Sequence, residues 1–451
     1  MSLLSSNEAE AILKKVLSFS KADELEATLQ GGRAAYTRFG MNSASSSGDT
    51  ENLSLAINAH FGQRSGIATT NTLDDQSLEK TVRAAEEIAH LRPEDPEQMP
   101  FLPKQQYETI AASFDEATYN ADAETRARAV AATIDPARAK NLTAAGIFDH
   151  TGGFVARANT VGNFGYHRST NTSYTTTVRS ADELGKTGSG WATSISHRIA
   201  DIDAKAVGAR AIEKAELSRE PVQIEPGNYT VILEPNAVGD LLAPMMNLFA
   251  ARAADEGRSF LSKKGGGNRI GEKLYGDEIN IYTDPNLAAS PGAPFDAQGL
   301  PTRRIDFVRA GVVQNLNYAR FWAKKMSKEP TPFPSNIVMD GGKTSIEDMI
   351  KTTERGILVT RFWYIRFVDA QTVLLTGLTR DGTFLIEQGR LKYAIKNFRF
   401  NETPVKMLNN IEAMSPVARI IGSERAGANL PILAPALRVR DFSFTSLSDA
   451  V

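Results

Sequence analysis

The sequence contains no cysteine in its 451 residues. This absence excludes disulfide bonds, a thiol nucleophile and thiolate metal ligands, and it fits a reducing compartment. The net charge is also small: the formal charge is −2 and the pI is near 6.3. No run of roughly five to eight basic residues occurs. A nucleic-acid partner is therefore not expected.

Long apolar runs are missing as well. No segment approaches the roughly 18 to 20 apolar residues that a membrane-spanning helix requires. Glu8, Glu10 and Lys14 interrupt residues 1–20, which argues against a secretory signal. The most apolar run, 357–368, contains two arginines and is typical of a buried strand. We therefore expect a soluble, cytoplasmic protein without membrane contact.

The histidines lack the spacing of a metal site. A zinc-peptidase helix needs two His about one turn apart and a neighbouring Glu, and this spacing occurs nowhere. The histidines are His60, His90, His150, His167 and His197. Three of them could converge in the fold, but surface or core roles are more typical of such dispersed residues. We expect no metal and no cofactor in this chain.

Other catalytic motifs are incomplete. Gly342-Lys343-Thr344 ends like a phosphate-binding loop, but Ile337 stands where that loop needs its first glycine. A turn with a helix cap is favoured there. The glycines at 265–267 could cradle an anion, although a flexible loop is the simpler interpretation. Pairs such as Ser77-x-x-Lys80 lack the companion elements of a serine enzyme. No catalytic residue is assigned from these fragments.

The first half of the chain shows the same order of elements twice. A helix, β-rich sequence and a second helix follow one another in each copy, which predicts an architectural repeat and an α+β fold with mostly antiparallel sheets. In the first copy, Asp74 is expected to cap a helix over 76–90. In the second, helices are predicted over 123–134 and 204–217, with a tight turn at 151–153 between strands.

Changes in composition divide the chain into four predicted segments. These are an N-terminal α/β domain at 1–92, a Pro-rich linker at 93–122, a central α/β domain at 123–225 and a β-rich C-terminal domain at 226–451. In the last domain, Thr344 is expected to open a helix that ends at Gly356. Strands are predicted over 357–368, 383–387, 392–400 and 437–444. The aromatic residues of 361–367 are expected to form sheet core on one face, with a ligand platform as the alternative.

A strand over 228–235 is predicted to lead into an amphipathic helix over 236–257. Its apolar residues recur at helical spacing and predict a buried stripe: Val238, Leu241, Leu242, Met245, Leu248 and Phe249. Burial of each such side chain contributes roughly 1.5 to 3 kcal/mol. Pro244 is compatible with a first helical turn that Asp240 caps.

Seven motifs occur in a fixed order along the chain. They are Gln63-Arg-Ser-Gly-Ile-Ala-Thr-Thr-Asn-Thr-Leu-Asp74, Val155-Ala-Arg-Ala-Asn-Thr-Val-Gly162, Tyr229-Thr-Val-Ile-Leu-Glu-Pro235, Arg269-Ile-Gly-Glu272, Glu354-Arg-Gly-Ile-Leu-Val-Thr-Arg361, Gly382-Thr-Phe-Leu-Ile-Glu-Gln-Gly389 and Pro435-Ala-Leu-Arg-Val-Arg-Asp-Phe442. Together they resemble the TldD/PmbA family, once labelled modulators of DNA gyrase and now regarded as peptidase subunits. The resemblance extends over almost the whole chain.

The resemblance implies two kinds of subunit. A TldD-like chain carries zinc on two His and a later Cys, with Glu as general base, and it pairs with a TldE/PmbA-like chain that lacks these groups. In this sequence the two His positions fall on Ala243 and Leu248, and the Glu position falls on Pro244. The late Cys would fall near Ile421 or Gly422. All four positions lack the required side chain.

The resemblance therefore implies a non-catalytic TldE/PmbA-like subunit, a pseudoenzyme within a zinc metallopeptidase complex. Zinc is expected only in a TldD-like partner, and the substrate is expected to be a small or unfolded peptide in extended form. The alternative is a stand-alone homodimeric protein that binds peptide or regulates without peptidase activity. A third interpretation, an enzyme with relocated ligands, is disfavoured by the dispersed histidines.

Overall fold

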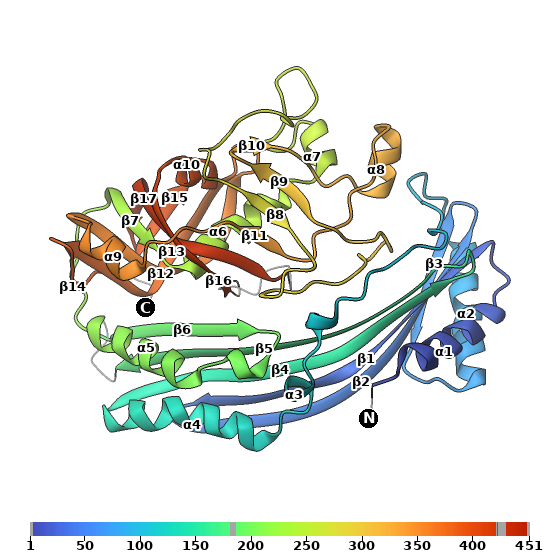
Figure 1. Ribbon diagram of the computed structural model, residues 1–451, viewed down its shortest axis with the longest axis horizontal. Coiled ribbons are helices and arrows are strands. Elements are labelled where there is room, and N and C mark those ends of the chain that lie inside the picture. The colour runs from blue at the N-terminus through green and yellow to red at the C-terminus, as the bar shows by residue number, and fades with distance from the viewer. Residues whose placement is uncertain (1–2, 181–185, 421, 423–429, 449–451) are drawn as a thin grey trace.

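The computed structural model describes residues 3–180, 186–420, 422 and 430–448. Its elements form two lobes that face each other (Figure 1). The N-terminal lobe contains the elements up to α5, and the C-terminal lobe contains those from β7 onward. Each lobe is built around one sheet, of six and eleven strands respectively. The predicted α+β fold is confirmed.

The N-terminal lobe is an antiparallel sheet in the order β3-β2-β1-β4-β5-β6. Its strands are β1 (Glu24–Gly40), β2 (Ser43–Phe61), β3 (Arg64–Thr70), β4 (Leu142–Asn159), β5 (Phe164–Ser180) and β6 (Ser189–Ser196). Its helices are α1 (Ser6–Ser18), α2 (Asp75–Leu91), α3 (Glu116–Tyr119), α4 (Ala123–Ala139) and α5 (Ala204–Leu217), with short 3-10 turns at Ala111–Ser113 and Ile199–Asp201. The side chain of Asp74 caps α2 as predicted.

The predicted repeat is present in this sheet. The order α1-β1-β2-β3-α2 recurs as α4-β4-β5-β6-α5, and β1 pairs with β4 at the centre. Strands from both sides of the predicted 93–122 linker thus belong to one sheet, while the domain boundaries themselves stay a prediction. Leu25, Leu29 and Phe39 of β1 lie in the two helix-covered cores. Successive side chains of a strand point to opposite faces, and these three residues are an even number of positions apart, so they lie on one face of the sheet. The helices of both cores therefore cover the same face.

The tight turn predicted at residues 151–153 is wrong. Gly152 and Gly153 lie inside β4, and Gly153 pairs directly with Gly32 of β1. A β-carbon at Gly32 would lie 2.4 Å from the carbonyl oxygen of Gly152, and one at Gly153 would lie 2.6 Å from that of Gly31. The glycines therefore allow a close approach of the two central strands. Each repeat contributes one Gly-Gly pair, Gly31-Gly32 in β1 and Gly152-Gly153 in β4.

The C-terminal lobe has a mixed sheet with β17 near its centre. Its strands are β7 (Gly227–Leu233), β8 (Ile281–Thr283), β9 (Ile305–Arg309), β10 (Val312–Val313), β11 (Ile337–Met339), β12 (Arg355–Asp369), β13 (Leu374–Glu387), β14 (Arg390–Ala394), β15 (Phe398–Glu402), β16 (Ile411–Ile420) and β17 (Ile432–Leu447). Its helices are α6 (Pro235–Asn247), α7 (Ala251–Asp255), α8 (Arg320–Lys325), α9 (Ile346–Lys351) and α10 (Pro404–Asn409). Apolar side chains from α6 and the sheet form the largest core of the molecule.

Two predictions in this lobe need correction, and one strand was missed. The helix expected from Thr344 to Gly356 is the shorter α9, whose cap is Ser345, and Gly356 already belongs to β12. The single strand expected over 392–400 is divided into β14 and β15. Strand β16 was not predicted, because Pro416 and a register shift between Met414 and Val417 interrupt its alternation.

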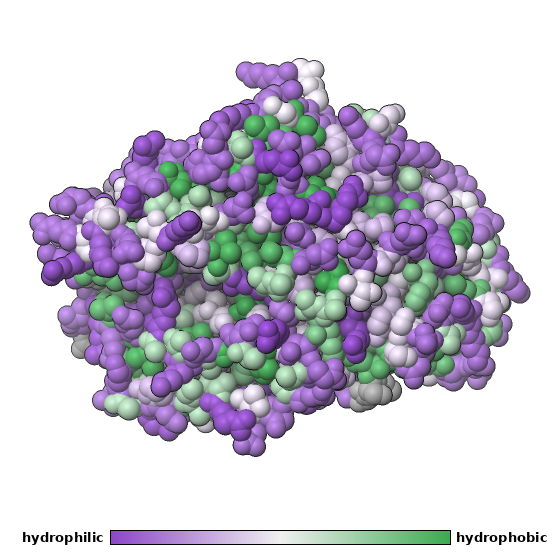
Figure 2. Space-filling view, viewed as in Figure 1, coloured by the Kyte–Doolittle hydropathy of each residue, from purple (hydrophilic) through white to green (hydrophobic). Residues whose placement is uncertain are grey.

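The lobes are in contact where β6 and α5 of the N-terminal lobe face the sheet of the C-terminal lobe. Strand β6 packs against β13 and β16, and α5 packs against β13. Figure 2 shows apolar residues gathered in the middle of the viewed face, between the two lobes, within a mostly hydrophilic surface. Among the helices of the described residues, none has the length and apolar character that spanning a bilayer requires.

Candidate functional site

Helix α6 and its C-cap residue Leu248 carry the three positions at which the resemblance expects metal-site residues. Glu234 is its N-cap residue and Pro235 occupies its first turn. Ala243, Pro244 and Leu248 are all half-buried, and Ala243 and Leu248 pack against the main core. A methyl group, a pyrrolidine ring and an isobutyl group offer no lone pair to a cation. The residues at these positions do not fit zinc.

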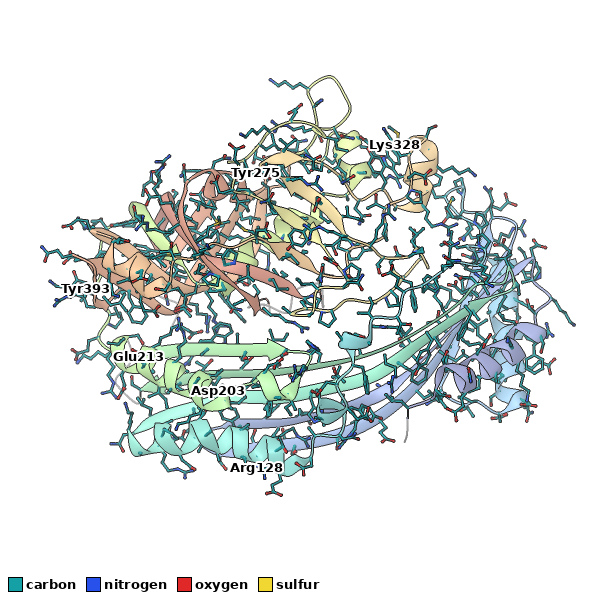
Figure 3. All side chains as sticks on the ribbon, viewed as in Figure 1. Arg128, Asp203, Glu213, Tyr275, Lys328 and Tyr393 are labelled. Carbon is teal, nitrogen blue, oxygen red and sulfur yellow. The ribbon has the colours of Figure 1, made fainter. Side chains whose placement is uncertain are left out.

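The predicted apolar stripe is confirmed. Val238, Leu241, Leu242, Met245 and Phe249 are buried in the main core. The hydroxyl of Tyr275 lies 3.7 Å from the sulfur of Met245, and Figure 3 shows Tyr275 within the C-terminal lobe. Burial raises the pKa of Tyr275, so its hydroxyl stays protonated. The interior beside α6 is thus packed with hydrocarbon.

The single helix predicted over 236–257 is divided into α6 and α7. Pro244 lies inside α6 rather than in its first turn, and it lacks the N–H that would bond to the carbonyl of Asp240. Beyond the end of α6, Phe249 accepts a backbone hydrogen bond from Asn317 at 2.8 Å and Ala251 donates one back at 2.9 Å. This exchange fixes Ala250, which is extended, between the end of α6 and the start of α7.

Asp240 does not cap α6, contrary to the prediction. Its carboxylate accepts a hydrogen bond from the backbone N–H of Phe362 at 3.2 Å. Phe362 belongs to β12 and is fully buried. Asp240 therefore fastens the middle of α6 to the strand beside it.

The second expected metal segment also lies beside α6. A β-carbon at Gly239 would lie 1.8 Å from the Cδ1 atom of Ile420, the last residue of β16. Gly422, one of the two positions proposed for the late Cys, follows shortly after, and Ile421 lies outside the described residues. The fold therefore brings together the two segments that the resemblance assigns to the metal site. The side chains needed for a metal are absent from the residues that the structure describes there.

The five histidines lie in separate surroundings. The ring of His60 stacks on that of Phe101, with 4.0 Å between the ring centroids. The ring of His90 stacks on that of Phe61, with 3.9 Å between the centroids. His150 lies 3.0 Å from the guanidinium of Arg126. Within the described ranges, no group of three or more His, Asp or Glu side chains is placed to hold a metal ion.

His150 and His167 are expected to make the fold sensitive to acid. Burial lowers the pKa of each to about 4, and for His150 the nearby Arg126 and Arg33 add to this effect. An unfolded His titrates near 6.5, so between pH 6.5 and 4 the unfolded chain binds protons that the folded chain does not. The free energy of unfolding should therefore fall with decreasing pH, by about 3 kcal/mol for each His over this window, at about 1.4 kcal/mol per pKa unit.

Urea unfolding at several pH values between 7 and 4.5 measures the slope of the free energy of unfolding against pH. His150→Gln keeps a hydrogen-bond acceptor for Arg126 but cannot titrate, so the variant should lose about half of the pH dependence that the two histidines cause. A slope that is unchanged in both His150→Gln and His167→Gln would show that other groups cause the acid sensitivity.

A buried ion cluster anchors the start of α6 to the N-terminal lobe. The carboxylate of Glu234 lies 2.8 Å from the ammonium of Lys214 and 2.9 Å from the guanidinium of Arg210, both on α5. Burial lowers the pKa of Lys214. Burial alone would raise the pKa of Glu234, but Lys214 and Arg210 hold it below its usual value. All three groups are thus charged near neutral pH.

A second polar cluster joins β6 to β12 and β13. Buried Asp381 accepts hydrogen bonds from the hydroxyl of Ser189 at 2.5 Å and from Nε of Arg361 at 3.0 Å. The guanidinium of Arg361 lies over the ring of Trp191 at 4.5 Å and over that of Trp363 at 5.1 Å. Burial opposes ionisation of Asp381, but Arg361 and Ser189 lower its pKa. Asp381 was not singled out from the sequence, because its partners are far away along the chain.

The expected sheet core at residues 361–367 holds for Phe362 and not for the whole segment. Phe362 packs on Phe400 and Phe442, whereas Trp363 is half-buried and Tyr364 and Phe367 are exposed. A bulge between Trp363 and Arg366 interrupts the strand alternation on which the prediction rested.

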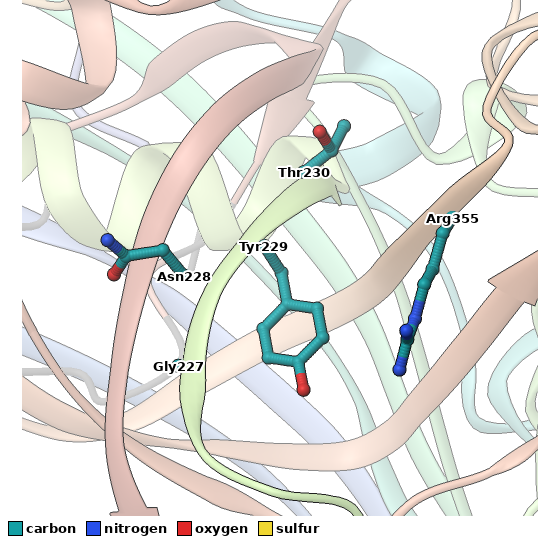
Figure 4. Close-up of a pocket in the computed structure, with 5 residues that line it drawn as sticks. All are labelled: Gly227, Asn228, Tyr229, Thr230 and Arg355. Carbon is teal, nitrogen blue, oxygen red and sulfur yellow. The ribbon is translucent and has the colours of Figure 1, made fainter.

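A surface pocket lies at the opposite end of β7 from α6. It has a volume of about 340 Å³ and is lined by Gly227, Asn228, Tyr229, Thr230 and Arg355. Figure 4 shows the side chains of Tyr229 and Arg355 side by side, on neighbouring strands. The Tyr229 hydroxyl donates a hydrogen bond to the carbonyl oxygen of Glu225 at 2.6 Å. The guanidinium of Arg355 suits a small anion rather than a metal ion, whereas the single proton of the Tyr229 hydroxyl is already engaged by Glu225.

Comparisons with known proteins agree with this arrangement. The family model of the PmbA/TldA metallopeptidase C-terminal domain matches residues 226–446, and that of the PmbA/TldA metallopeptidase central domain matches residues 95–219. The chain is 23% identical to the metalloprotease PmbA of Escherichia coli O157:H7 over 437 residues, which cover 91% of this chain and 93% of that protein. It is 22% identical over 263 residues to a metalloprotease of Methanothermobacter thermautotrophicus, across 53% of this chain and 55% of that protein.

Solved structures show the same fold. TldE from Thermococcus kodakarensis superposes with a TM-score of 0.86 at 17% identity and covers 97% of this chain and 99% of its own. A candidate modulator of a DNA gyrase from Thermotoga maritima superposes with a TM-score of 0.83 at 16% identity, with coverage of 97% and 100%.

Proposed function

Because the chain belongs to the PmbA/TldD metallopeptidase family, we propose that it is a non-catalytic, TldE/PmbA-like subunit of a cytoplasmic zinc metallopeptidase complex. The complex would cleave small or unfolded peptides that bind in extended form. One observation carries this proposal: Ala243, Pro244 and Leu248, at the positions where the family resemblance expects metal-site residues, have side chains that can neither hold zinc nor move a proton.

The zinc of the complex would belong to a TldD-like partner, where it would polarise the peptide carbonyl and activate a water molecule. This chain would instead supply a packed scaffold beside the partner and limit which peptides reach the partner's zinc. The hydrocarbon core beside α6 and the ion cluster at Glu234 support a rigid scaffold in place of a metal cavity. Such a scaffold could order the partner's loops and restrict the chamber to extended peptides.

Affinity purification of the tagged chain from its native host tests this proposal. We expect a TldD-like protein with the His-Glu-x-x-x-His motif to co-elute in near-stoichiometric amount and to carry the zinc. A tag-only purification from the same cells is the matched control. Recovery of this chain alone, as a metal-free homodimer, would contradict the proposal and favour a stand-alone peptide-binding protein.

A further inference from the structure

Arg419, near the end of β16, is a half-buried cation whose charge the chain leaves poorly compensated. One terminal nitrogen of its guanidinium donates a hydrogen bond to Oδ1 of Asn171 at 3.1 Å, and the other lies 3.5 Å from Nδ1 of His197. Its Nε–H is shielded from solvent and has no hydrogen-bond partner among the described residues. An arginine keeps its charge in proteins, and burial of a charge is costly unless an opposite charge accompanies it.

The carboxylates around this group are engaged elsewhere. The charge of Asp201 acts on Arg419 through space, but its carboxylate accepts a hydrogen bond from the hydroxyl of Ser196 at 2.7 Å. Asp115, whose charge acts on His197, is the N-cap residue of α3. Neither carboxylate forms an ion pair with Arg419. An anion from outside the chain can therefore take the place of the missing counter-ion.

The polar atoms that this group leaves unbonded in the described part of the chain are hydrogen-bond donors. Because Oδ1 of Asn171 accepts from Arg419, its amide NH2 is the group left to bind a ligand. Burial and the charge of Arg419 lower the pKa of His197, so its ring is neutral near neutral pH. With Nδ1 turned to the guanidinium, the ring carries its proton on Nε2. N–H donors gathered around one guanidinium suit an oxyanion.

The group lies where the two lobes face each other. Arg419 belongs to β16, which packs against β6, while Asn171 belongs to β5 and His197 follows the end of β6. Figure 1 shows β16 above β5 and β6. Successive side chains of a strand point to opposite faces, so Ile420 reaches Gly239 of α6 while Arg419 faces the N-terminal lobe. Both lobes thus contribute to the group.

We propose that Arg419, Asn171 and His197 form a binding site for the carboxylate of a small ligand. A carboxylate matches the single charge of one guanidinium and accepts hydrogen bonds from it in a planar arrangement. Val417 lies two residues before Arg419 on the same face of β16 and is 41% exposed, so an apolar surface borders the site. These features fit the C-terminal carboxylate of a short peptide with an apolar last residue. The choice of a peptide rests on the proposed function, whereas the anion site itself does not.

Binding of a peptide acid and of its amide to the purified chain tests the inference. The probes are N-acetyl-alanyl-leucine and the same dipeptide with a C-terminal amide, and ligand-observed NMR gives the Kd of each. We expect the acid to bind at least about tenfold more tightly than the amide, which is the contribution of one charge-assisted hydrogen-bond pair. Inorganic phosphate is the competing anion, and it should not displace the acid at equal concentration.

Two variants and a matched control assign the binding to this group. Arg419→Met should reduce the affinity for the acid to that for the amide, while Arg399→Met, at an exposed arginine of β15, should leave it unchanged. Asn171→Asp supplies a carboxylate from within the chain where Oδ1 now accepts from Arg419. This variant should raise the Tm and abolish binding of the acid, so it tests the site even where Arg419→Met does not fold.

Equal affinity for the acid and the amide would overturn the inference and leave the proposed function intact. Wild-type affinity for the acid in Asn171→Asp would overturn it as well. Displacement of the acid by phosphate at equal concentration would contradict the choice of a carboxylate. Failure of the chain to recover a TldD-like partner from its host would contradict the proposed function alone, because the purified chain should still bind the acid.

Discussion

Replacing Glu234 by alanine is expected to lower the free energy of unfolding by about 3 to 5 kcal/mol, because it leaves a buried ammonium without its counter-ion. Glu234 lies at the start of α6, and Lys214, its closest partner, is almost fully buried on α5. The loss should therefore loosen the contact between the lobes as well as the helix. Urea unfolding followed by fluorescence measures the change.

Two variants separate the contributions at this cluster. Arg210→Ala removes the partner that is 44% exposed, so its effect should be no more than about 1 kcal/mol. Lys214→Met combined with Glu234→Ala removes both buried charges, and it should be less destabilising than Glu234→Ala alone. If Glu234→Ala cost less than Arg210→Ala, the cluster would not be the anchor described above.

Replacing Asp381 by alanine should cost a similar amount, about 3 to 5 kcal/mol, since the buried guanidinium of Arg361 loses its carboxylate. The variant also removes the bond from Ser189 that joins the lobes. Trp191 and Trp363 flank Arg361 and are two of the three tryptophans in the chain. Their fluorescence should therefore report the local change directly.

Asp381→Asn is the matched control for charge. Asp381 has a φ of 52°, and asparagine tolerates this conformation as aspartate does. The asparagine variant should lose the charge pairing with Arg361 while keeping the backbone unstrained and an oxygen available to Ser189. Equal stability of Asp381→Asn and the wild type would show that the charge of Asp381 contributes nothing to the contact between the lobes.

Local patterns in the sequence predicted the elements that depend on local physics. The apolar spacing of Val207, Ala211 and Ala215 predicted α5 over its observed range. The cap at Asp74 and the buried stripe of α6 could be predicted in the same way, because each depends on residues a few positions apart. The repeat followed from element order alone.

Features that depend on distant contacts could not be predicted in this way. Gly152 and Gly153 have the composition of a turn, and only the pairing of β4 with β1 shows that they allow close strand packing. The end of α6 depends on an exchange of hydrogen bonds with Asn317. The metal positions expected at Ala243, Pro244 and Leu248 come from the family resemblance alone, whereas the polar clusters at Glu234 and Asp381 join residues on separate lobes.

The central claim is that this chain completes a peptidase whose zinc lies in another subunit. Its most direct test is cleavage of an unfolded peptide by the purified chain, by the purified TldD-like subunit and by their equimolar mixture, with the zinc content of each sample. We predict no cleavage and no stoichiometric zinc for this chain alone, and cleavage by the mixture at a rate well above that of the partner alone. Zinc-dependent cleavage by this chain alone, abolished by substitution of one of its own histidines, would contradict the account.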